Sequence, residues 1–420
     1  MTTDVIVIGA GASGMMAAYF AAQEGASVLV LDKNNRTGKK LRITGKGRCN
    51  LTNNCDVREV LANIPGDGRF LYSALTAFPP EQVMRFFEEL GLALKTERGK
   101  RVFPQSDNAN DVADLLQQIC KRSGVVFRKS EESGLLLHAG QIAGVKTGAE
   151  TLPCGACIVC TGGLSYPLTG STGDGYRFAE TAGHTVTALR PSLVPLESDD
   201  PCCERLQGLS LKNVELRVFE NEKLLCREQG EMLFTHFGVS GPLVLSASSR
   251  MRHFDTADYR LEIDLKPALD EKTLDQRIQR DLKKYRNRTF RNSLCDLIPH
   301  ALIPEMERLC EVPENLQANE VTREYRSKLL HSLKAFPVSV TGTRPYAEAI
   351  VTSGGVSTKE IDPRSMRSKI VQGLYFAGEV LDLDAYTGGF NLQIAWATGR
   401  LAGISAGQYS QKDRMKIDYE

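Results

Sequence analysis

Three glycines near the start of the chain, Gly9, Gly11 and Gly14, have the spacing of a dinucleotide-binding turn. The first permits a tight turn, the second lets the backbone approach a pyrophosphate, and the third lets a helix pack on a strand. Asp32 follows about 20 residues later, where a carboxylate can accept hydrogen bonds from ribose hydroxyls. These residues predict a site for the adenosine diphosphate half of a dinucleotide.

This fingerprint requires a strand before the turn, a helix after it and a second strand that ends at the acid. The apolar run 5–8 predicts the first strand, residues 12–23 predict the helix, and residues 27–31 predict the second strand. The N-terminus of such a helix directs partial positive charge at the phosphates. The order of elements predicts a Rossmann-like α/β fold.

Residues near the other end of the chain separate NAD from FAD. Residues 373–377 predict a short strand before Gly378 and Glu379, and Gly389 precedes a helix-like run over 392–402. FAD is longer than one strand–helix–strand unit can hold, so its ribityl chain and flavin ring need a second contact. Gly378 allows close backbone approach, and Glu379 can accept from ribityl hydroxyls. We therefore predict FAD.

The loop 38–53, directly after the second predicted strand, combines glycine, hydroxyl, amide and cationic side chains. Backbone N–H groups and basic side chains in such a loop can cradle an anion. Its position after Asp32 places it along the pyrophosphate and the flavin. An exposed basic loop is the alternative interpretation.

Candidates for acid–base or thiol chemistry are fewer. His236 is the best candidate for a general acid or base, because the pKa of an unperturbed histidine lies near neutrality. A structural histidine is the alternative. Cys49 is a candidate redox or adduct-forming thiol, with packing against the cofactor as its alternative role. Tyr166 and Tyr346 are further proton-donor candidates.

The composition is that of an ordinary globular protein. The chain has 420 residues, of which 42% are hydrophobic and 25% charged, and the formal net charge is +1. No basic cluster precedes the first apolar strand, and no apolar run reaches the roughly 18 residues of a spanning helix. We expect a cytoplasmic protein with a small-molecule substrate and neither a membrane nor a nucleic-acid partner. The oligomeric state is not indicated.

Eleven cysteines without an export signal indicate reduced thiols. Cys154, Cys157 and Cys160 have the spacing of metal ligands. Side chains alternate along the predicted strand 157–160, however, so Cys157 and Cys160 face opposite sides, and no compact group of Cys or His follows. We predict no metal site.

The pattern of elements changes twice along the chain. Residues 1–190 alternate strand-like and helix-like segments, residues 191–267 predict short strands and turns, and residues 268–336 are charged and helical. We predict a discontinuous FAD-binding domain over 1–190 and 337–420, interrupted by the insertion 191–336. Residues 277–288 hold the one concentration of basic residues. A solvated helix face is the first interpretation, and a surface for RNA or another anionic partner is the alternative.

Four segments are distinctive as a set: residues 43–53, 161–176, 234–242 and 352–399. Together they resemble the BaiN-like, aminoacetone-oxidase-like family of FAD-dependent flavoproteins, and the likeness runs along nearly the whole chain. The resemblance implies a FAD-binding domain of the glutathione-reductase type, interrupted by a β-barrel-like and a helical insertion. Substrates in this family range from small amines to steroid-like rings.

The resemblance also implies which residues contact FAD. Besides the glycine turn and Asp32, they are Ala12, Ser13, Lys33, Lys40, Leu41, Gly47, Arg48, Cys49, Asn50, Thr161, Gly162, Gly378, Glu379, Gly389, Phe390, Asn391 and Leu392. The adenine contact falls near Ser133, where the family usually has an apolar residue. Ala385 and Phe390 stand where the family often has Gly and Tyr.

The sequence therefore predicts a FAD-dependent oxidoreductase that transfers hydride between a small organic substrate and the flavin. Because one dinucleotide fingerprint is present, NAD(P)H would act only as a transient electron donor. The alternative is an RNA-associated or redox-sensing flavoprotein whose FAD is not catalytic. The sequence leaves open the substrate and the choice between reductase and oxidase.

Overall fold

The structure is a computed structural model that describes residues 3–131, 134–148 and 150–417, with side chains described through residue 411. The chain divides into two compact units, Met1–Ser192 with Tyr346–Glu420, and Leu193–Pro345. We call them the first and the second unit. Each has its own cluster of buried hydrophobic side chains.

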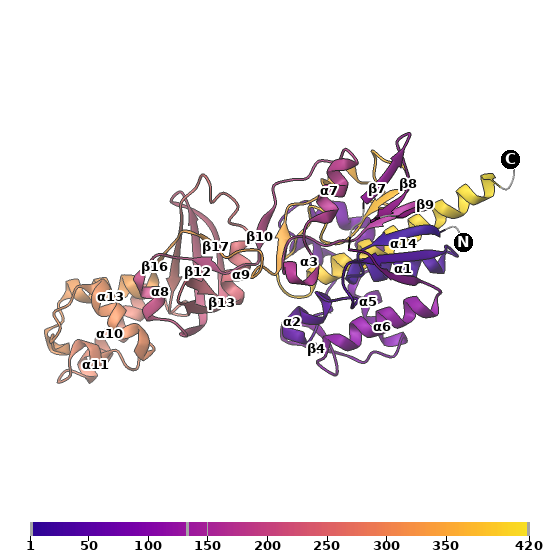
Figure 1. Ribbon diagram of the computed structural model, residues 1–420. Helices are drawn as coiled ribbons and strands as arrows, with labels where there is room; N and C mark the ends of the chain where they lie inside the picture. The colour runs from indigo at the N-terminus through magenta and orange to yellow at the C-terminus, as the bar shows by residue number, and fades with distance from the viewer. Residues whose placement is uncertain (1–2, 132–133, 149, 418–420) are drawn as a thin grey trace. The chain divides into compact units, whose positions relative to one another are not determined.

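A seven-stranded sheet forms the centre of the first unit, in the order β6-β2-β1-β9-β8-β7, with β19 also paired to β9 (Figure 1). The strands are β1 Thr3–Ile8, β2 Val28–Asp32, β6 Val126–Lys129, β7 Gly134–His138, β8 Gln141–Thr147, β9 Glu150–Val159 and β19 Leu374–Phe376. Strands β6, β2, β1, β9 and β19 are parallel, whereas β7, β8 and β9 pair antiparallel. Strands β1, β9 and β19 end in register at Ile8, Val159 and Phe376, and Asp32 of β2 lies one residue beyond the partner of Ile8. Ligands bind beyond this edge in open α/β sheets.

Helices and two small sheets complete the first unit. The helices are α1 Ala12–Gln23, α2 Thr44–Gly47, α3 Val57–Ala62, α4 Tyr72–Ala77, α5 Pro80–Glu89, α6 Ala109–Arg122, α7 Asp174–Thr181 and α14 Phe390–Ile417. The small sheets are β3 (Thr52–Asn53), β5 (Arg101–Pro104) and β4 (Leu94–Glu97), and the pair β10 (Arg190–Ser192) and β18 (Val351–Ser353). Helix α1 has the predicted bounds, whereas α14 is longer than the predicted helix 392–402.

Helices α1 and α14 bring the two ends of the chain together at close range. A side chain on Gly399 would lie 2.4 Å from the carbonyl oxygen of Ser13, and one on Gly403 would lie 2.3 Å from that of Ala17. Only glycine allows this backbone approach. Helix α1 and the part of α14 around Gly399 and Gly403 therefore pack directly against each other.

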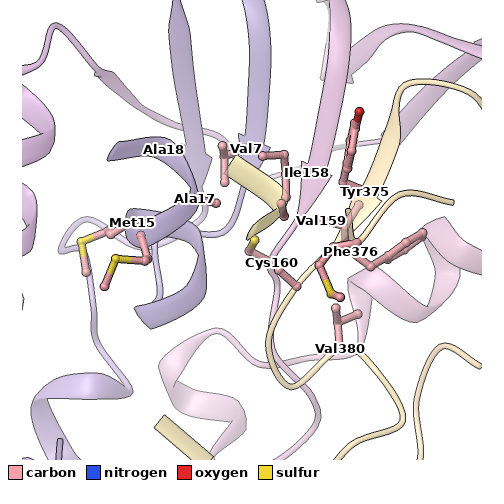
Figure 2. Packing of buried hydrophobic residues seen from close by; sticks show 14 of the residues in the cluster. Val7, Met15, Ala17, Ala18, Ile158, Val159, Cys160, Tyr375, Phe376 and Val380 are labelled. Carbon is pink, nitrogen blue, oxygen red and sulfur yellow. The ribbon is translucent and has the colours of Figure 1, made fainter. Parts of the chain in front are cut away.

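The central strands and α1 share one dry core. Figure 2 shows Val7 of β1, Ile158 of β9 and Tyr375 of β19 among the buried side chains, together with Met15 and Ala17 of α1. These side chains are at most 1% exposed. Burial on this scale fixes the strand ends relative to the N-terminus of α1.

The second unit is built on an antiparallel sheet in the order β16-β15-β12-β13-β14-β11-β17. Its strands are β11 Leu196–Glu197, β12 Ser210–Glu220, β13 Lys223–Thr235, β14 Gly238–Ser240, β15 Tyr259–Asp264, β16 Phe336–Val340 and β17 Gly342–Thr343. Its helices are α8 Pro201–Arg205, α9 Pro242–Ser248, α10 Glu271–Lys284, α11 Phe290–Ser293, α12 Ile303–Cys310 and α13 Arg323–Lys334. The helical stretch predicted over 268–336 is thus four helices, interrupted near its prolines. Closure of the sheet into a barrel stays a prediction.

Residues 337–345, which the sequence analysis assigns to the FAD-binding domain, lie in the second unit. Strand β16 pairs antiparallel with β15, with Leu261 opposite Val338, and β17 pairs with β11. The strand-like sequence was recognised, but its pairing partners were not, because pairing is a long-range property. Across the described part of the chain, no helix has the length and apolar character to span a membrane.

Candidate flavin site

The glycine turn connects β1 to α1, and the surroundings of each of its three glycines differ. Gly9 has φ +105°, and a side chain on it would lie 2.4 Å from the carbonyl oxygen of Cys160. A side chain on Gly14 would lie 1.8 Å from the carbonyl oxygen of Gly9, so the third glycine permits helix–strand packing. A side chain on Gly11 would meet nothing within 4 Å. Gly11 therefore borders open space, as a pyrophosphate site requires.

Asp32 is fixed at the end of β2 by backbone donors. Its Oδ2 accepts from the N–H of Ala10 at 2.6 Å, and its Oδ1 accepts from the N–H of Asn34 at 2.7 Å. Each carboxylate oxygen keeps lone-pair capacity for a further donor. This geometry fits the predicted role of accepting from ribose hydroxyls.

Lys40 and Glu379 form a half-buried ion pair. The Nζ of Lys40 lies 2.6 Å from Oε2 of Glu379, and the two side chains are 21% and 20% exposed. The other oxygen, Oε1, accepts from Ser165 Oγ at 2.8 Å and from the N–H of Thr352 at 2.9 Å. The structure thus brings together two residues that were predicted from opposite ends of the chain.

Gly378 precedes Glu379 and contacts the first turn of α1. It has φ +80°, and a side chain on it would lie 2.4 Å from Ser13 Oγ in the first turn of α1. Its N–H donates to Thr398 Oγ1 of α14 at 3.0 Å. Ser13, Gly378 and α14 are therefore in mutual contact beside the glycine turn.

The segment 49–53 is hydrogen-bonded to the start of α14. Asn50 accepts from the N–H of Gly389 at 2.9 Å through its amide oxygen. The further bonds are Thr52 Oγ1 to Gln393 Oε1 at 2.6 Å, Asn53 Nδ2 to Gly388 O at 3.0 Å, and Trp396 Nε1 to Leu51 O at 2.8 Å. Gly389 has φ +101°, and a side chain there would lie 2.4 Å from Thr52 backbone atoms. Hydrogen bonds thus join the predicted anion-cradling loop to the predicted flavin-contact turn.

Within that loop, Gly45, Lys46 and Gly47 have φ values of 57°, 59° and 82°. A side chain on Gly47 would meet nothing within 4 Å, so this part of the loop also borders open space. Leu41, which precedes it, is only 2% exposed. An accessible backbone at Gly47, close in sequence to the buried Leu41, is the arrangement expected of a ligand-binding loop.

The side chains of Arg48, Lys33 and Asn391 are bound within the protein. Arg48 pairs with Glu97 at 2.5 Å and with Asp107 at 2.6 Å, and these hydrogen bonds raise its pKa above the usual arginine value. Lys33 pairs with Asp174. Asn391 accepts from the N–H of Ala385 at 2.9 Å and donates to the carbonyl of Ala385 at 2.7 Å, while the neighbouring Phe390 and Leu392 are buried and half-buried.

Cys49 has the environment of a packing residue. Its side chain is fully buried, and burial raises the pKa of its thiol to about 12. The thiolate is the reactive form, so such a thiol is inert near pH 7. The geometry favours the packing alternative over the redox role.

His236 lies in the second unit, on the exposed turn between β13 and β14. Its ring packs edge-on against Phe237, with ring centroids 5.1 Å apart. The residues of the flavin site lie in the first unit. Its role as a proton donor stays a prediction.

Three predicted FAD-contact residues remain: Thr161, Gly162 and Ser133. Thr161 and Gly162 follow β9 at the ligand edge of the sheet, and Gly162 has φ +72°. Ser133 lies outside the described residues.

The cysteines with metal-ligand spacing are buried thiols. Burial raises the pKa of Cys154 and Cys160 to about 12. The described residues contain no group of three or more His, Cys, Asp or Glu placed to hold a metal.

Sequence reasoning missed four polar residues at this site. Ser165 and Thr352 hold Glu379, Gln393 holds Thr52, and the hydroxyl of Tyr176 is buried without a hydrogen-bond partner among the described residues. Ser165 and Tyr176 lie in the distinctive segment 161–176, and Thr352 and Gln393 lie in the distinctive segment 352–399, so these two segments were the available signal. A surface pocket of about 280 Å³, lined by Phe20, Phe78, Gln82, Arg85, Phe86, Glu89 and Arg400, contains none of the predicted FAD-contact residues.

A family model described as the HI0933-like protein Rossmann domain matches residues 3–405. The chain belongs to this HI0933-like family. It is a family of FAD-dependent flavoprotein oxidoreductases, and this confirms the resemblance and the cofactor predicted from the sequence. The open backbone at Gly11 and the fixed carboxylates of Asp32 and Glu379 fit FAD.

Two relatives of the HI0933-like chain match almost end to end. A 3-dehydro-bile acid delta(4,6)-reductase of Clostridium scindens is 30% identical over 96% of this chain and 98% of its own length. A ribosomal RNA dihydrouridine synthase of Escherichia coli is 32% identical over 94% of this chain and 96% of its own length. Both names are those of enzymes, and this chain is an enzyme of the same family.

The fold has a wider distribution. The solved structure of a 3-ketosteroid delta1-dehydrogenase from Sterolibacterium denitrificans aligns over 97% of this chain and 99% of its own, with a TM-score of 0.52 and 14% identity. This likeness shows the fold alone. The Rossmann-like α/β fold with an inserted antiparallel sheet is thereby confirmed.

Proposed function

We propose that this chain is a FAD-dependent reductase that acts on a carbon–carbon double bond conjugated to a ring carbonyl. The reactions named for the two relatives share this feature. A 3-dehydro-bile acid carries a ketone beside its ring double bonds, and uridine carries a carbonyl beside the double bond that dihydrouridine lacks. The observation that carries the proposal is the ion pair of Lys40 and Glu379, which joins the two predicted halves of a FAD site.

Different residues of the site would hold different parts of FAD. Asp32 would accept from the adenosine ribose, the backbone at Gly11 and the N-terminus of α1 would receive the pyrophosphate, and Glu379 would accept from the ribityl hydroxyls. The turn at Gly389 would lie at the pyrimidine edge of the flavin. When bound, FAD supplies the hydride chemistry, with NAD(P)H as the transient donor.

The protein would supply orientation, charge and a proton. The ammonium group of Lys40 orients the carboxylate of Glu379, whose oxygens are acceptors for hydroxyl donors. Cys49 and Phe390 are buried apolar side chains that exclude water beside the loop and the turn. We assign His236 as the group that donates a proton to the substrate carbon next to the carbonyl. A cytoplasmic location is part of the proposal.

The experiment begins with the visible spectrum of the purified protein, followed by anaerobic reduction with NADH or NADPH. The reduced protein is then mixed with a cyclic enone or with uridine, and with the saturated ring ketone as the matched control. Reoxidation by a conjugated substrate and none by the saturated ketone is the expected result. Reoxidation by oxygen alone would show an oxidase and overturn the proposal.

A further inference from the structure

Two adjacent cysteines, Cys202 and Cys203, lie in helix α8 of the second unit. They are the only adjacent pair among the eleven cysteines of the chain, and both are free thiols. Cys202 is half-buried, whereas Cys203 is 1% exposed. Solvent therefore reaches the pair from the side of Cys202. Neither residue belongs to the candidate flavin site, which lies in the first unit.

The two thiols interact with each other. The hydrogen bond between their side chains affects both pKa values most, because it lowers the pKa of Cys203 from the ordinary 9.0 and raises that of Cys202. A hydrogen bond from Ser198 also lowers the pKa of Cys203, against the effect of burial. In such a pair the two sulfurs share one proton, and either can carry the negative charge. The pair thus provides the thiolate, which is the nucleophilic form.

Two carboxylates near the pair have partners of their own. Asp200 accepts from the backbone N–H of Ser339 at 2.6 Å. Glu305 accepts from Nε and Nη2 of Arg205 at 2.7 and 2.8 Å. These contacts offset negative charge that would otherwise disfavour a thiolate on Cys202.

A disulfide between adjacent residues is strained by its geometry. Adjacent Cα atoms are ~3.8 Å apart across a trans peptide, whereas disulfides usually join Cα atoms about 4.4–6.8 Å apart. Strain makes a disulfide easier to reduce, which is typical of regulatory disulfides. Helix α8 has only five residues, and the N–H of Leu206 donates to the carbonyl of Cys202 at 2.9 Å. Few backbone hydrogen bonds therefore change if the pair is oxidised.

We propose that Cys202 and Cys203 form a redox-active dithiol that hydrogen peroxide oxidises reversibly to a disulfide. The sulfur of Cys202, as the thiolate, attacks one peroxide oxygen. An S–O bond forms, the O–O bond breaks, and the other oxygen takes up a proton and leaves as water. The sulfur of Cys203 then attacks the sulfenic sulfur, so that the S–S bond forms, the S–O bond breaks and a second water leaves. Two thiols and one peroxide give one disulfide and two waters, and two electrons pass from sulfur to oxygen.

Packing is the alternative role of the pair, because α8 contacts β13 and β14. The two roles differ in the products of oxidation. A packing thiol reacts slowly and alone, whereas a dithiol gives a disulfide that a reductant restores.

The test treats the full holoenzyme with hydrogen peroxide, alkylates the remaining thiols and analyses the digested protein by mass spectrometry. The peptide that contains Cys202 and Cys203 should lose two hydrogens and regain them with dithiothreitol. Its oxidation should be at least about tenfold faster than that of Cys295, a half-buried cysteine of the same unit. Cys295 has the carboxylate of Asp296 beside it rather than a second thiol.

Three variants separate the roles of the two sulfurs. In Cys203→Ser, oxidation of Cys202 should stop at the sulfenic acid, which dimedone traps. In Cys202→Ser, the buried Cys203 should stay reduced. Cys295→Ser is the matched control and should leave disulfide formation unchanged. Thermal unfolding shows whether each variant is folded.

A second measurement uses the unmodified protein and needs no variant. Phenylarsine oxide, which bridges two neighbouring thiols, should protect Cys202 and Cys203 from alkylation and from peroxide. Three results would overturn the inference: oxidation of the pair no faster than that of Cys295, sulfinic and sulfonic acids without a disulfide, or a pair that phenylarsine oxide does not protect.

Discussion

The Nζ of Lys40 lies 2.6 Å from Oε2 of Glu379, although the two residues are 339 positions apart in the chain. Ser165 and Thr352 bind the other oxygen of the same carboxylate. One side chain therefore connects the loop after β2, the loop after β9 and the turn after β19. The site depends on long-range contacts between both ends of the first unit.

Replacing either partner of this pair should weaken FAD binding. Glu379→Gln keeps one acceptor oxygen but loses the negative charge, and Lys40→Met leaves that charge unbalanced, so each should lower FAD affinity about tenfold. The double variant should be less affected than the product of the two effects, since both remove one interaction. Titration of the apoprotein with FAD measures this. Glu59→Gln, which breaks the exposed pair with Lys100 at 2.6 Å, is the control and should leave FAD affinity unchanged.

Alanine at two positions of the glycine turn should separate binding from folding. Gly11→Ala places a methyl group in open space, so the apoprotein should keep its thermal stability while FAD affinity falls. Gly14→Ala places the methyl group 1.8 Å from a carbonyl oxygen and should destabilise the fold by a few kcal/mol or more. Thermal unfolding with and without FAD measures both effects. Equal FAD affinity in Gly11→Ala and the unmodified protein would show that no phosphate lies there.

His236→Gln should lower turnover of a conjugated substrate about 10²–10⁴-fold if this histidine donates the proton. The FAD spectrum and the rate of flavin reduction by NAD(P)H should not change, because the proposed role of His236 is confined to proton transfer to the substrate. Stopped-flow kinetics separates the two half-reactions. His300→Gln, an exposed histidine of the same unit, is the control. Unchanged turnover in His236→Gln would assign the proton to another group.

The buried thiols should make the protein less stable at alkaline pH. Burial raises the pKa of Cys49, Cys120 and Cys154 from the ordinary 9.0 to about 12. Above pH 9 the unfolded chain loses thiol protons that the folded chain keeps, so the free energy of unfolding falls as pH rises. The slope is up to about 1.4 kcal/mol per pH unit for each thiol. Denaturant titrations between pH 8 and 11 measure it, and a flat profile would contradict this account of the thiols.

The local elements were accessible from the sequence because short-range chemistry determines them. The turn between Ile8 and Ala12 and the bounds of α1 follow from glycine spacing and apolar runs. The hairpin β7–β8 was missed, since Leu135 to Leu137 form a continuous apolar run without alternation and the pairing shifts register between Leu136 and Leu137. Helix α14 is longer than predicted because its glycines, which usually mark helix ends, face α1 instead.

The sequence identified many residues of the site but not the hydrogen bonds that connect them. Asp32, Lys40 and Glu379 were identified by type and position, whereas Thr352 and Gln393 were not. The partners of these two residues lie 27 and 341 positions away. Contacts across such separations depend on tertiary packing, which a single sequence does not display.

The central claim is that both ends of the chain hold one FAD molecule. The most direct measurement is the visible absorption spectrum of the purified protein, with the amount of FAD released on denaturation. The account predicts a yellow protein that releases one FAD per chain, and a Glu379→Gln variant that binds FAD about tenfold more weakly. A colourless protein that takes up no added FAD, or a Glu379→Gln variant that retains FAD as tightly as the unmodified chain, would contradict it.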